Sequence, residues 1–409
     1  MNTIAEILPL TETLTPGDEA AVVDAVRHAY RDGTPIYPIG GGTHLDFGTR
    51  PTRPGVGLAL GRLNRVVDHP ADDMTITVEA GVTMAELGRR LRAEKQRLPV
   101  DVARADRATV GGVVATDPSG PRQFAAGTIR DYLLGFRAVD GRGTPFAAGG
   151  RVVKNVAGYN LSRLMTGSLG TLGVITQVTL MARPMPEASA IVACDVPDFA
   201  AAERLLAALV RTETDPAAVE LHAGADERAK PLLGALPESS VARLFVGFES
   251  SREEVNWMVG QLRLEWEALD VAPPTIVSHA QVEPLWQWLA DFDAQLQVNV
   301  LPGATVAAIE RVLDAVPGCS IRSRAGNGVI LIRLSSLGPE EFVTAVRTQL
   351  RPAIAQCGGH LVVRSYPDGA ALTGEDVWGP PADGAAVMRA VKDRFDPDGL
   401  LNPGRFVFD

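Results

Sequence analysis

The chain has 409 residues, 46% of them hydrophobic, and a formal net charge of −10 at neutral pH. This length predicts two or three domains at about 100 to 200 residues each, in a globular rather than a disordered protein. The acidic balance argues against nucleic acid or an anionic lipid surface as partner, because either needs clustered Lys and Arg.

Targeting signals and cysteines bear on the cellular location. The first residues lack a basic segment before their apolar positions, and no uninterrupted apolar stretch of roughly 18 residues occurs, so we expect neither secretion nor a transmembrane segment. Cys194, Cys319 and Cys357 are odd in number and far apart, which indicates a reducing compartment. We therefore expect a cytoplasmic protein, with peripheral attachment at the inner face of the membrane through partners left open.

The first hundred residues predict helices and strands around a glycine loop. A helix is expected from Pro16, its first helical position, to the stop signal at Gly33. An apolar strand over 36–39 leads directly into three glycines, and alternation over 74–79 predicts a half-buried strand. A capping box that begins at Thr83 opens the next helix.

The remaining chain predicts a loop-rich sheet region followed by a second domain. Over 105–183 glycines interrupt short β-branched runs, and prolines just beyond mark a boundary. The order over 295–364 is βαββαβ, the split βαβ unit of ferredoxin-like folds, and helices over 197–211 and after Ser251 indicate a degenerate second copy. The segment 387–408 predicts a short helix and a turn-dense tail outside the core.

Glycine-rich segments are the main candidates for ligand binding. The sequence has no phosphate loop of NTPases, no H-E-x-x-H and no G-x-S-x-G, and its G-x-x-G-x-x-G at 167–173 lacks dinucleotide spacing. Three glycines at 40–42 follow a strand, where backbone amides can surround a diphosphate without a Cβ in the way. A glycine-rich hairpin turn would give the same local pattern, but a second such stretch at 109–112 favours the ligand loop.

These stretches resemble the vanillyl-alcohol oxidase flavoproteins, whose FAD domain is also called the p-cresol methylhydroxylase type. The resemblance runs through nearly the whole chain, including the ending at 395–404. Residues 109–112, 120–122 and 129–131, and above all the thirteen-residue run 153–165, resemble the FAD-binding E subunit of bacterial glycolate oxidase.

The resemblance implies an α+β fold. A p-cresol methylhydroxylase-type FAD-binding domain is expected at 1–183, a cap domain of ferredoxin-like units at 184–358, and a C-terminal return to the FAD domain at 359–409. The cofactor implied is FAD, with its diphosphate on the first glycine loop. The residues implied to bind it are Gly40, Gly41, Gly42, Thr43, His44, Thr109, Val110, Gly111, Gly112, Thr116, Gly127, Thr128, Asp131, Gly173, Val174, Ile175 and Asn402.

Two features separate this chain from other members of the family. Some relatives bond the flavin to a histidine directly after the paired glycines, but here Thr43 stands at that place and His44 follows, so we expect non-covalent FAD. Relatives that oxidise D-2-hydroxy acids carry His-x-Gly-Asp-Gly-Asn-x-His and Gly-Glu-His-Gly motifs, which supply metal ligands and a base. At the positions of those side chains this chain has Arg324, Leu331, Arg364 and Ser365.

These replacements leave the catalytic residues unknown and predict no metal site. Arg, Leu and Ser neither bind a divalent ion as histidine does nor accept a proton near neutral pH. Arg324 and Arg364 either form salt bridges within the cap or pair with a substrate carboxylate.

The resemblance implies a flavin subunit of a glycolate oxidase complex that converts glycolate to glyoxylate. The resemblance also implies the partners, a homologous catalytic FAD subunit and an iron–sulfur subunit. This chain lacks the cysteines for an iron–sulfur cluster of its own, so onward electron transfer needs a partner. Its expected role is to support the complex or relay electrons. Two alternatives stay open: a self-sufficient FAD-dependent oxidoreductase for another 2-hydroxy acid or alcohol, and a non-catalytic scaffold subunit.

Overall fold

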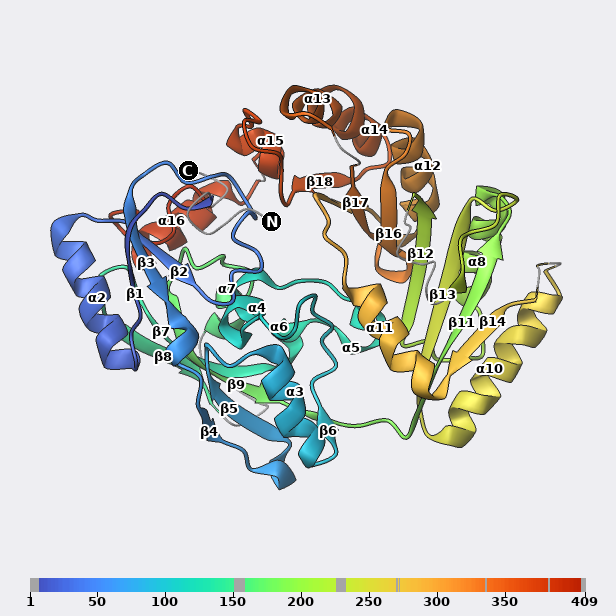
Figure 1. Cartoon of the computed structure of the whole chain (residues 1–409), viewed down its shortest axis with the longest axis horizontal. Helices are drawn as coiled ribbons and strands as arrows, with labels where there is room; N and C mark the ends of the chain where they lie inside the picture. Colours follow the sequence, from blue (N-terminus) through green and yellow to red (C-terminus); the bar gives the residue numbers. More distant parts are fainter. Residues whose placement is uncertain are drawn as a thin grey trace. The chain divides into compact units, whose positions relative to one another are not determined.

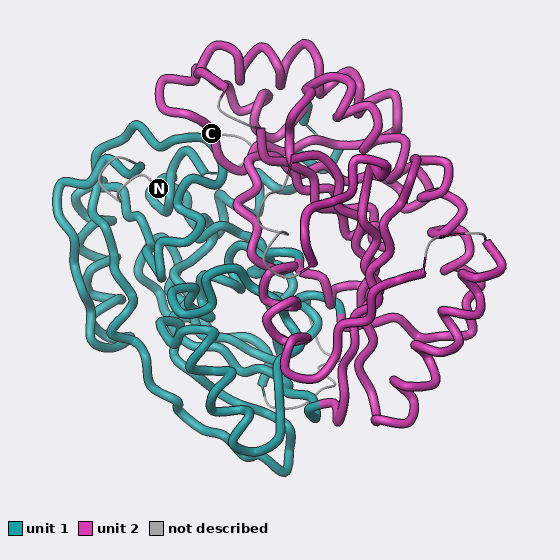
Figure 2. Tube along the Cα trace, turned by 45° about the vertical axis from the view of Figure 1, so that its right-hand side comes forward, with its two compact units in different colours: residues 1–119, 127–185, 380–409 teal, residues 120–126, 186–379 magenta. Residues whose placement is uncertain are grey.

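The computed structural model describes residues 7–150, 159–225, 233–269, 271, 273–334, 337–381 and 383–405. They form two compact units, each built from separate stretches of sequence (Figure 2). The first unit takes residues 1–119, 127–185 and 380–409, and the second takes 120–126 and 186–379. Part of the thirteen-residue run, 153–158, lies outside the described residues.

These divisions differ from the expected domains at two places. The return to the first unit begins at 380 rather than 359, because the strand β18 (His360–Val363) hydrogen-bonds to the sheet of the second unit. The short excursion 120–126 into the second unit was not predicted. Its side chain Arg122 binds Glu249 at 2.9 Å and stacks 4.1 Å from the ring of Trp286, which holds the excursion in place.

The first unit contains two main sheets (Figure 1). One is parallel with the order β1-β3-β2, one is antiparallel with the order β4-β5-β9-β7-β8, and β6 pairs with β10. The strands are β1 (Leu10–Leu14), β2 (Ile36–Ile39), β3 (Gly55–Ala59), β4 (Val66–Asp68), β5 (Thr75–Glu79), β6 (Gln96–Arg97), β7 (Leu133–Val139), β8 (Pro145–Gly149), β9 (Val174–Met181) and β10 (Arg183–Pro184).

Short helices connect these strands. The α-helices are α2 (Glu19–Asp32), α3 (Met84–Ala93), α4 (Val110–Thr116), α6 (Ile129–Tyr132), α7 (Leu161–Met165) and α16 (Ala385–Phe395). Helix α2 begins three residues after Pro16, because the carboxylate of Asp18 accepts a hydrogen bond from the N–H of Ala21 and caps the helix there. It ends as predicted at Gly33, which has a left-handed backbone.

The turn-dense tail belongs to the core, against the prediction. Leu400 and Leu401 are buried, and the tail pairs with β2 through Ile36 N–H to Leu400 O and Asn402 N–H to Ile36 O, each at 2.8 Å. The Lys392 ammonium donates to Asp396 at 2.6 Å and to the carbonyl of Leu401 at 3.1 Å. A buried ion pair at the end of α16 therefore fixes the path of the tail.

The second unit is an eight-stranded sheet made of two βαββαβ halves, so both predicted ferredoxin-like units are present. Its strand order β14-β11-β13-β12-β16-β17-β15-β18 joins the halves along β12 and β16. The strands are β11 (Ala188–Val196), β12 (Ala218–Gly224), β13 (Ala242–Ser250), β14 (Thr275–Ser278), β15 (Leu296–Asn299), β16 (Ser320–Arg324), β17 (Val329–Arg333) and β18. The α-helices are α5 (Gln123–Ala126), α8 (Phe199–Leu209), α10 (Arg252–Glu267), α11 (Val282–Ala290), α12 (Thr305–Ala315), α13 (Pro339–Thr344), α14 (Arg351–Ala355) and α15 (Gly374–Trp378).

The two faces of this sheet differ in composition. Helices α8, α10, α12, α13 and α14 cover one face and share a large apolar core with it (Figure 1). On the other face, α11 packs on Ile191 and Phe245 through Leu285, Trp286 and Leu289. This second face also carries charged side chains where the two halves meet, so it is the polar face of the cap.

We expect Lys392→Met to lower the free energy of unfolding of the first unit by about 3–5 kcal/mol, because it leaves the buried Asp396 carboxylate without its cation. Native-state hydrogen exchange of first-unit amides measures this loss. The matched control is Arg90→Met on α3 of the same unit, which removes an exposed pair with Glu86 at the same i, i+4 spacing and should cost about 1 kcal/mol or less. Equal effects of the two substitutions would contradict the proposed importance of the buried pair.

Candidate functional site

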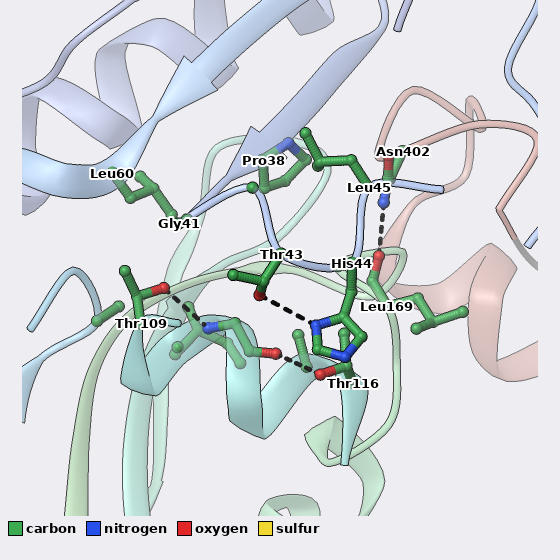
Figure 3. Close-up of a pocket in the computed structure, with 18 of the residues that line it drawn as sticks. Pro38, Gly41, Thr43, His44, Leu45, Leu60, Thr109, Thr116, Leu169 and Asn402 are labelled. Carbon is green, nitrogen blue, oxygen red and sulfur yellow. Dashed lines mark hydrogen bonds between the residues drawn. The ribbon is translucent and has the colours of Figure 1, made fainter. Parts of the chain in front are cut away.

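A pocket in the first unit lies between helix α4 and the loop 40–44 that follows β2 (Figure 3). The space between its walls is about 830 Å³, part of it open to solvent. The residues that line it are Pro38, Gly40, Gly41, Gly42, Thr43, His44, Leu45, Phe47, Leu60, Ala80, Thr109, Gly111, Gly112, Ala115, Thr116, Leu169, Gly170, Gly173, Ile175, Asn402 and Arg405.

The glycine loop needs its glycines because atoms of neighbouring residues come very close. A Cβ on Gly41 would lie 1.7 Å from the carbonyl oxygen of Arg107, and one on Gly40 would lie 2.3 Å from Oγ1 of Thr109. Gly42 has φ +68°, a left-handed conformation that side chains disfavour. The loop is thus held as a bare backbone ribbon along one wall of the pocket.

Helix α4 forms the facing wall. Thr109 caps the helix by accepting a hydrogen bond from the N–H of Gly112 at 3.4 Å, and Thr116 Oγ1 donates to the Gly112 carbonyl at 2.8 Å (Figure 3). A Cβ on Gly111 would lie 2.6 Å from the Cβ of Ala80, just after β5. Small residues therefore allow the helix to pack tightly while leaving its other side open to the pocket.

The other walls combine apolar side chains with a single cationic one. Leu60, Ala115 and Ile175 contribute apolar surface, and Asn402 Nδ2 donates to the carbonyl of Leu169 at 2.6 Å. Arg405, buried and bonded to the carbonyl of Phe47 at 3.0 Å, is the charged residue among the described lining. A pocket with a bare backbone loop, apolar walls and no lining carboxylate in the described part of the chain suits a large ligand that carries an anionic group.

Most of the predicted cofactor residues come together here. Those that line the pocket are Gly40, Gly41, Gly42, Thr43, His44, Thr109, Gly111, Gly112, Thr116, Gly173, Ile175 and Asn402. Thr43 Oγ1 and His44 Nδ1 lie 3.0 Å apart, and both side chains reach toward α4 (Figure 3).

The other predicted residues do not line this pocket. Val110 and Val174 are fully buried in the cores of the unit. Gly127, Thr128 and Asp131 form the start of α6, where the Thr128 N–H donates to the Asp131 carboxylate at 2.9 Å in a capping box.

Sequence reasoning missed several walls of the pocket. Leu45 and Phe47 follow the glycine loop closely, Leu60 and Ala80 follow strands, and Arg405 lies near the end of the chain. None of them belongs to a glycine-rich stretch. The one available signal was proximity in sequence to a predicted residue, for Leu45 and Phe47 after His44 and for Arg405 after Asn402.

In the second unit, the four residues that stand in place of the expected histidine-containing motifs make contacts within the cap. Arg324 on β16 is buried, and its Nη1 lies 3.5 Å from the buried carboxylate of Glu220 on β12, so it forms a salt bridge where the halves meet. Leu331 packs with Phe292 and Val329 in a small apolar cluster. Arg364 Nη1 donates to Gln297 Oε1 at 3.2 Å, and the Ser365 N–H donates to the Gln295 carbonyl at 3.2 Å.

The histidine nearest these residues is held neutral. His222 Nε2 lies 3.4 Å from the Glu220 carboxylate, and its ring contacts Phe245 and Trp288. Burial, followed by the charges of Arg322, Arg324 and Arg243, lowers the pKa of His222 well below its usual value. Arg322 itself donates to backbone carbonyls of Trp288 and Asp291 at the end of α11, so it caps that helix.

Two family models match the chain. The model of the FAD binding domain matches residues 12–149, and that of the FAD linked oxidases, C-terminal domain, matches 185–310 and 380–406. The first contains most of the pocket, and the last segment of the second contains Asn402 and Arg405.

Curated relatives match either nearly the whole chain or less than half of it. A D-2-hydroxyglutarate dehydrogenase of Xanthomonas citri pv. viticola is 27% identical over 95% of this chain and 88% of its own. Glycolate oxidase subunit GlcD of Bacillus subtilis is 25% identical over 91% of this chain and 83% of its own. Glycolate oxidase subunit GlcE of Escherichia coli is 37% identical over 41% of this chain and 48% of its own.

Solved structures share the fold. An alkyldihydroxyacetonephosphate synthase has a TM-score of 0.69 at 20% identity, over 96% of this chain and 75% of its own. A chitooligosaccharide oxidase has a TM-score of 0.68 at 14% identity, over 98% of this chain and 92% of its own. The predicted α+β fold with a p-cresol methylhydroxylase-type FAD-binding domain is confirmed.

The residues of the pocket fit FAD. The bare backbone of the glycine loop gives a diphosphate close access to amide donors, with the buried Arg405 as a cation in the same lining. The apolar walls suit the ring systems at its two ends. Thr43 at the position after the paired glycines has no imidazole to bond to the flavin.

We expect Ala115→Trp to raise the dissociation constant for FAD by about a hundredfold or more, since an indole at this position fills the pocket. Titration of the apoprotein followed by flavin fluorescence gives the constant. The matched control is Ala85→Trp on the exposed side of α3, which should bind FAD as the unchanged chain does. Full flavin occupancy in Ala115→Trp would place the cofactor elsewhere.

Proposed function

We propose that this chain, an FAD-dependent oxidoreductase with the FAD-binding domain and the C-terminal domain of FAD-linked oxidases, is a flavin subunit of a complex that oxidises glycolate to glyoxylate. In this role it resembles the FAD-binding E subunit of bacterial glycolate oxidase. The partners proposed for this chain are a homologous catalytic FAD subunit and an iron–sulfur subunit. Its relatives named as glycolate oxidase subunits support this assignment.

The observation that carries the proposal is the contrast between the two units. The first unit has a pocket whose described lining fits the cofactor, while the cap uses Arg324 for a salt bridge and Leu331 for apolar packing. When bound, FAD supplies an acceptor for two electrons. Oxidation of a hydroxy acid also needs a base for the hydroxyl proton, and a guanidinium or an aliphatic side chain cannot take it.

The cysteines support a need for partners in electron transfer. Burial raises the pKa of Cys194 and of Cys319 to about 11, so both remain thiols rather than the thiolates that ligate iron. With three cysteines in its sequence, the chain lacks the four ligands of an ordinary cluster. Electrons that leave this subunit would therefore pass to an iron–sulfur partner.

The proposed location is the cytoplasm, with peripheral attachment at the inner face of the membrane through the partners. The three cysteines are free, as in a reducing compartment. Within the described residues, we find no helix whose length and apolar character would let it span a bilayer.

We expect acid precipitation of the purified holoprotein to leave the flavin in the supernatant, because Thr43 cannot form a histidyl bond to it. The absorbance of the two fractions measures the partition. Flavin that stays with the pellet would contradict non-covalent binding and point to His44, and His44→Ala would then release it.

We expect the isolated chain to show negligible dye reduction with glycolate, and activity to appear when the homologous FAD subunit and the iron–sulfur subunit are added. General-base assistance alone is worth about a hundred- to ten-thousand-fold in rate. The measurement is anaerobic dye reduction together with the visible spectrum of the flavin before and after glycolate.

The alternatives give different results in the same experiment. Turnover of glycolate by the single chain at the rate of the complex would contradict the proposal and favour a self-sufficient oxidoreductase for hydroxy acids or alcohols. A complex that remains fully active when the flavin pocket of this chain is blocked by Ala115→Trp would favour a non-catalytic scaffold.

A further inference from the structure

Two arginines behind the glycine loop bind its backbone carbonyls. Arg104 Nη2 donates to the carbonyl of Thr43, and Arg107 Nη2 donates to the carbonyl of Gly41 at 3.3 Å. The two carbonyls are two residues apart on the same loop. Arg104 is partly buried and Arg107 is exposed, so the contact of Arg104 is the better shielded from water.

These contacts determine where the neighbouring amides point. In a trans peptide the C=O of one residue and the N–H of the next lie in one plane and point in opposite directions. With the Gly41 and Thr43 carbonyls turned to the guanidinium groups, the N–H groups of Gly42 and His44 face the other way. Gly42 and His44 both line the pocket.

The segment that carries the arginines is itself well anchored. Hydrogen bonds from Ala85 N–H to Ala105 O at 2.9 Å and from Met84 N–H to Ala108 O at 2.8 Å attach it to the start of α3. The Arg107 carbonyl also lies against the Cα of Gly41. These backbone contacts therefore hold the segment that carries Arg104 and Arg107 in a defined position beside the glycine loop.

We propose that Arg104, assisted by Arg107, is a positioning residue that turns the amides of the glycine loop toward the diphosphate of FAD. This inference rests on the proposed cofactor site. It assigns to the two arginines no contact with the ligand: their guanidinium groups hold the carbonyls, and the amide donors bind the anion. The same charges polarise the intervening peptides and so strengthen their N–H groups as donors.

The test compares FAD with riboflavin, which has the flavin ring but no diphosphate. Dissociation constants of both are measured by flavin fluorescence on apoprotein of the full chain, with Arg104→Leu, Arg107→Leu and Arg104→Lys. We expect Arg104→Leu to weaken FAD binding about ten- to a hundred-fold, the usual value of a hydrogen bond to a charged group, and to leave riboflavin within about twofold. Arg107→Leu should have a smaller effect in the same direction, because its contact is longer and exposed.

Two controls separate positioning from general destabilisation. Arg89→Leu removes an exposed arginine that binds Glu86 on α3 and should change neither constant. Arg104→Lys keeps one charged donor and should recover part of the preference for FAD, which restored packing alone would not do. Equal weakening of FAD and riboflavin, or an unchanged constant for FAD in both leucine variants, would overturn the inference.

The failure of the proposed cofactor site would look different. In that case the unaltered apoprotein would bind FAD no more tightly than riboflavin, so no diphosphate preference would exist. If the unaltered chain prefers FAD and the leucine variants keep that preference in full, only the role of the arginines is wrong.

Discussion

The ammonium group of Lys392 joins two segments of the first unit that are far apart in sequence, the loop at Thr171 and the stretch from α16 to the tail. It donates to the Thr171 carbonyl at 2.8 Å as well as to Asp396 and Leu401, and Asp396 in turn accepts hydrogen bonds from the N–H groups of Leu400 and Leu401. A buried charge with this many partners is stable only in one arrangement. It therefore fixes both the loop beside Gly170 and the tail that carries Asn402, two walls of the cofactor pocket.

The cap uses a buried ion pair in a comparable way. Its two βαββαβ halves meet edge to edge, and Glu220 on one half faces Arg324 on the other. The large apolar core on the opposite face supplies most of the stability, whereas a charge pair adds a preference for one register. At Arg324 the resemblance implied a histidine in members of the family that oxidise hydroxy acids, whereas here this side chain forms the ion pair that joins the two halves of the sheet.

The sequence was most informative where structure is local. The strand over 36–39 followed by glycines and the βαββαβ order over 295–364 were predictable. Hydrophobic periodicity, turn residues and helix caps are each recognisable within a few neighbouring residues. The tail was misjudged: its turn residues are real, but the burial of Leu401 follows from pairing with Ile36, far away in sequence. Likewise, nothing in the sequence near Arg405 indicates its hydrogen bond to the carbonyl of Phe47, although its closeness to Asn402 was a sign that it lies at the pocket.

The pairing of the tail with β2 also has a consequence for how the protein is made. Arg405 and Phe47 are 358 positions apart in sequence. The N–H of Ile36 on β2 can bond to the carbonyl of Leu400 only after Leu400 has been synthesised. During synthesis β2 therefore lacks its pairing with the tail until the whole cap has been translated, so the cap can fold first. Because Asn402 and Arg405 line the cofactor pocket, the pocket gains these walls only after the end of the chain has been synthesised.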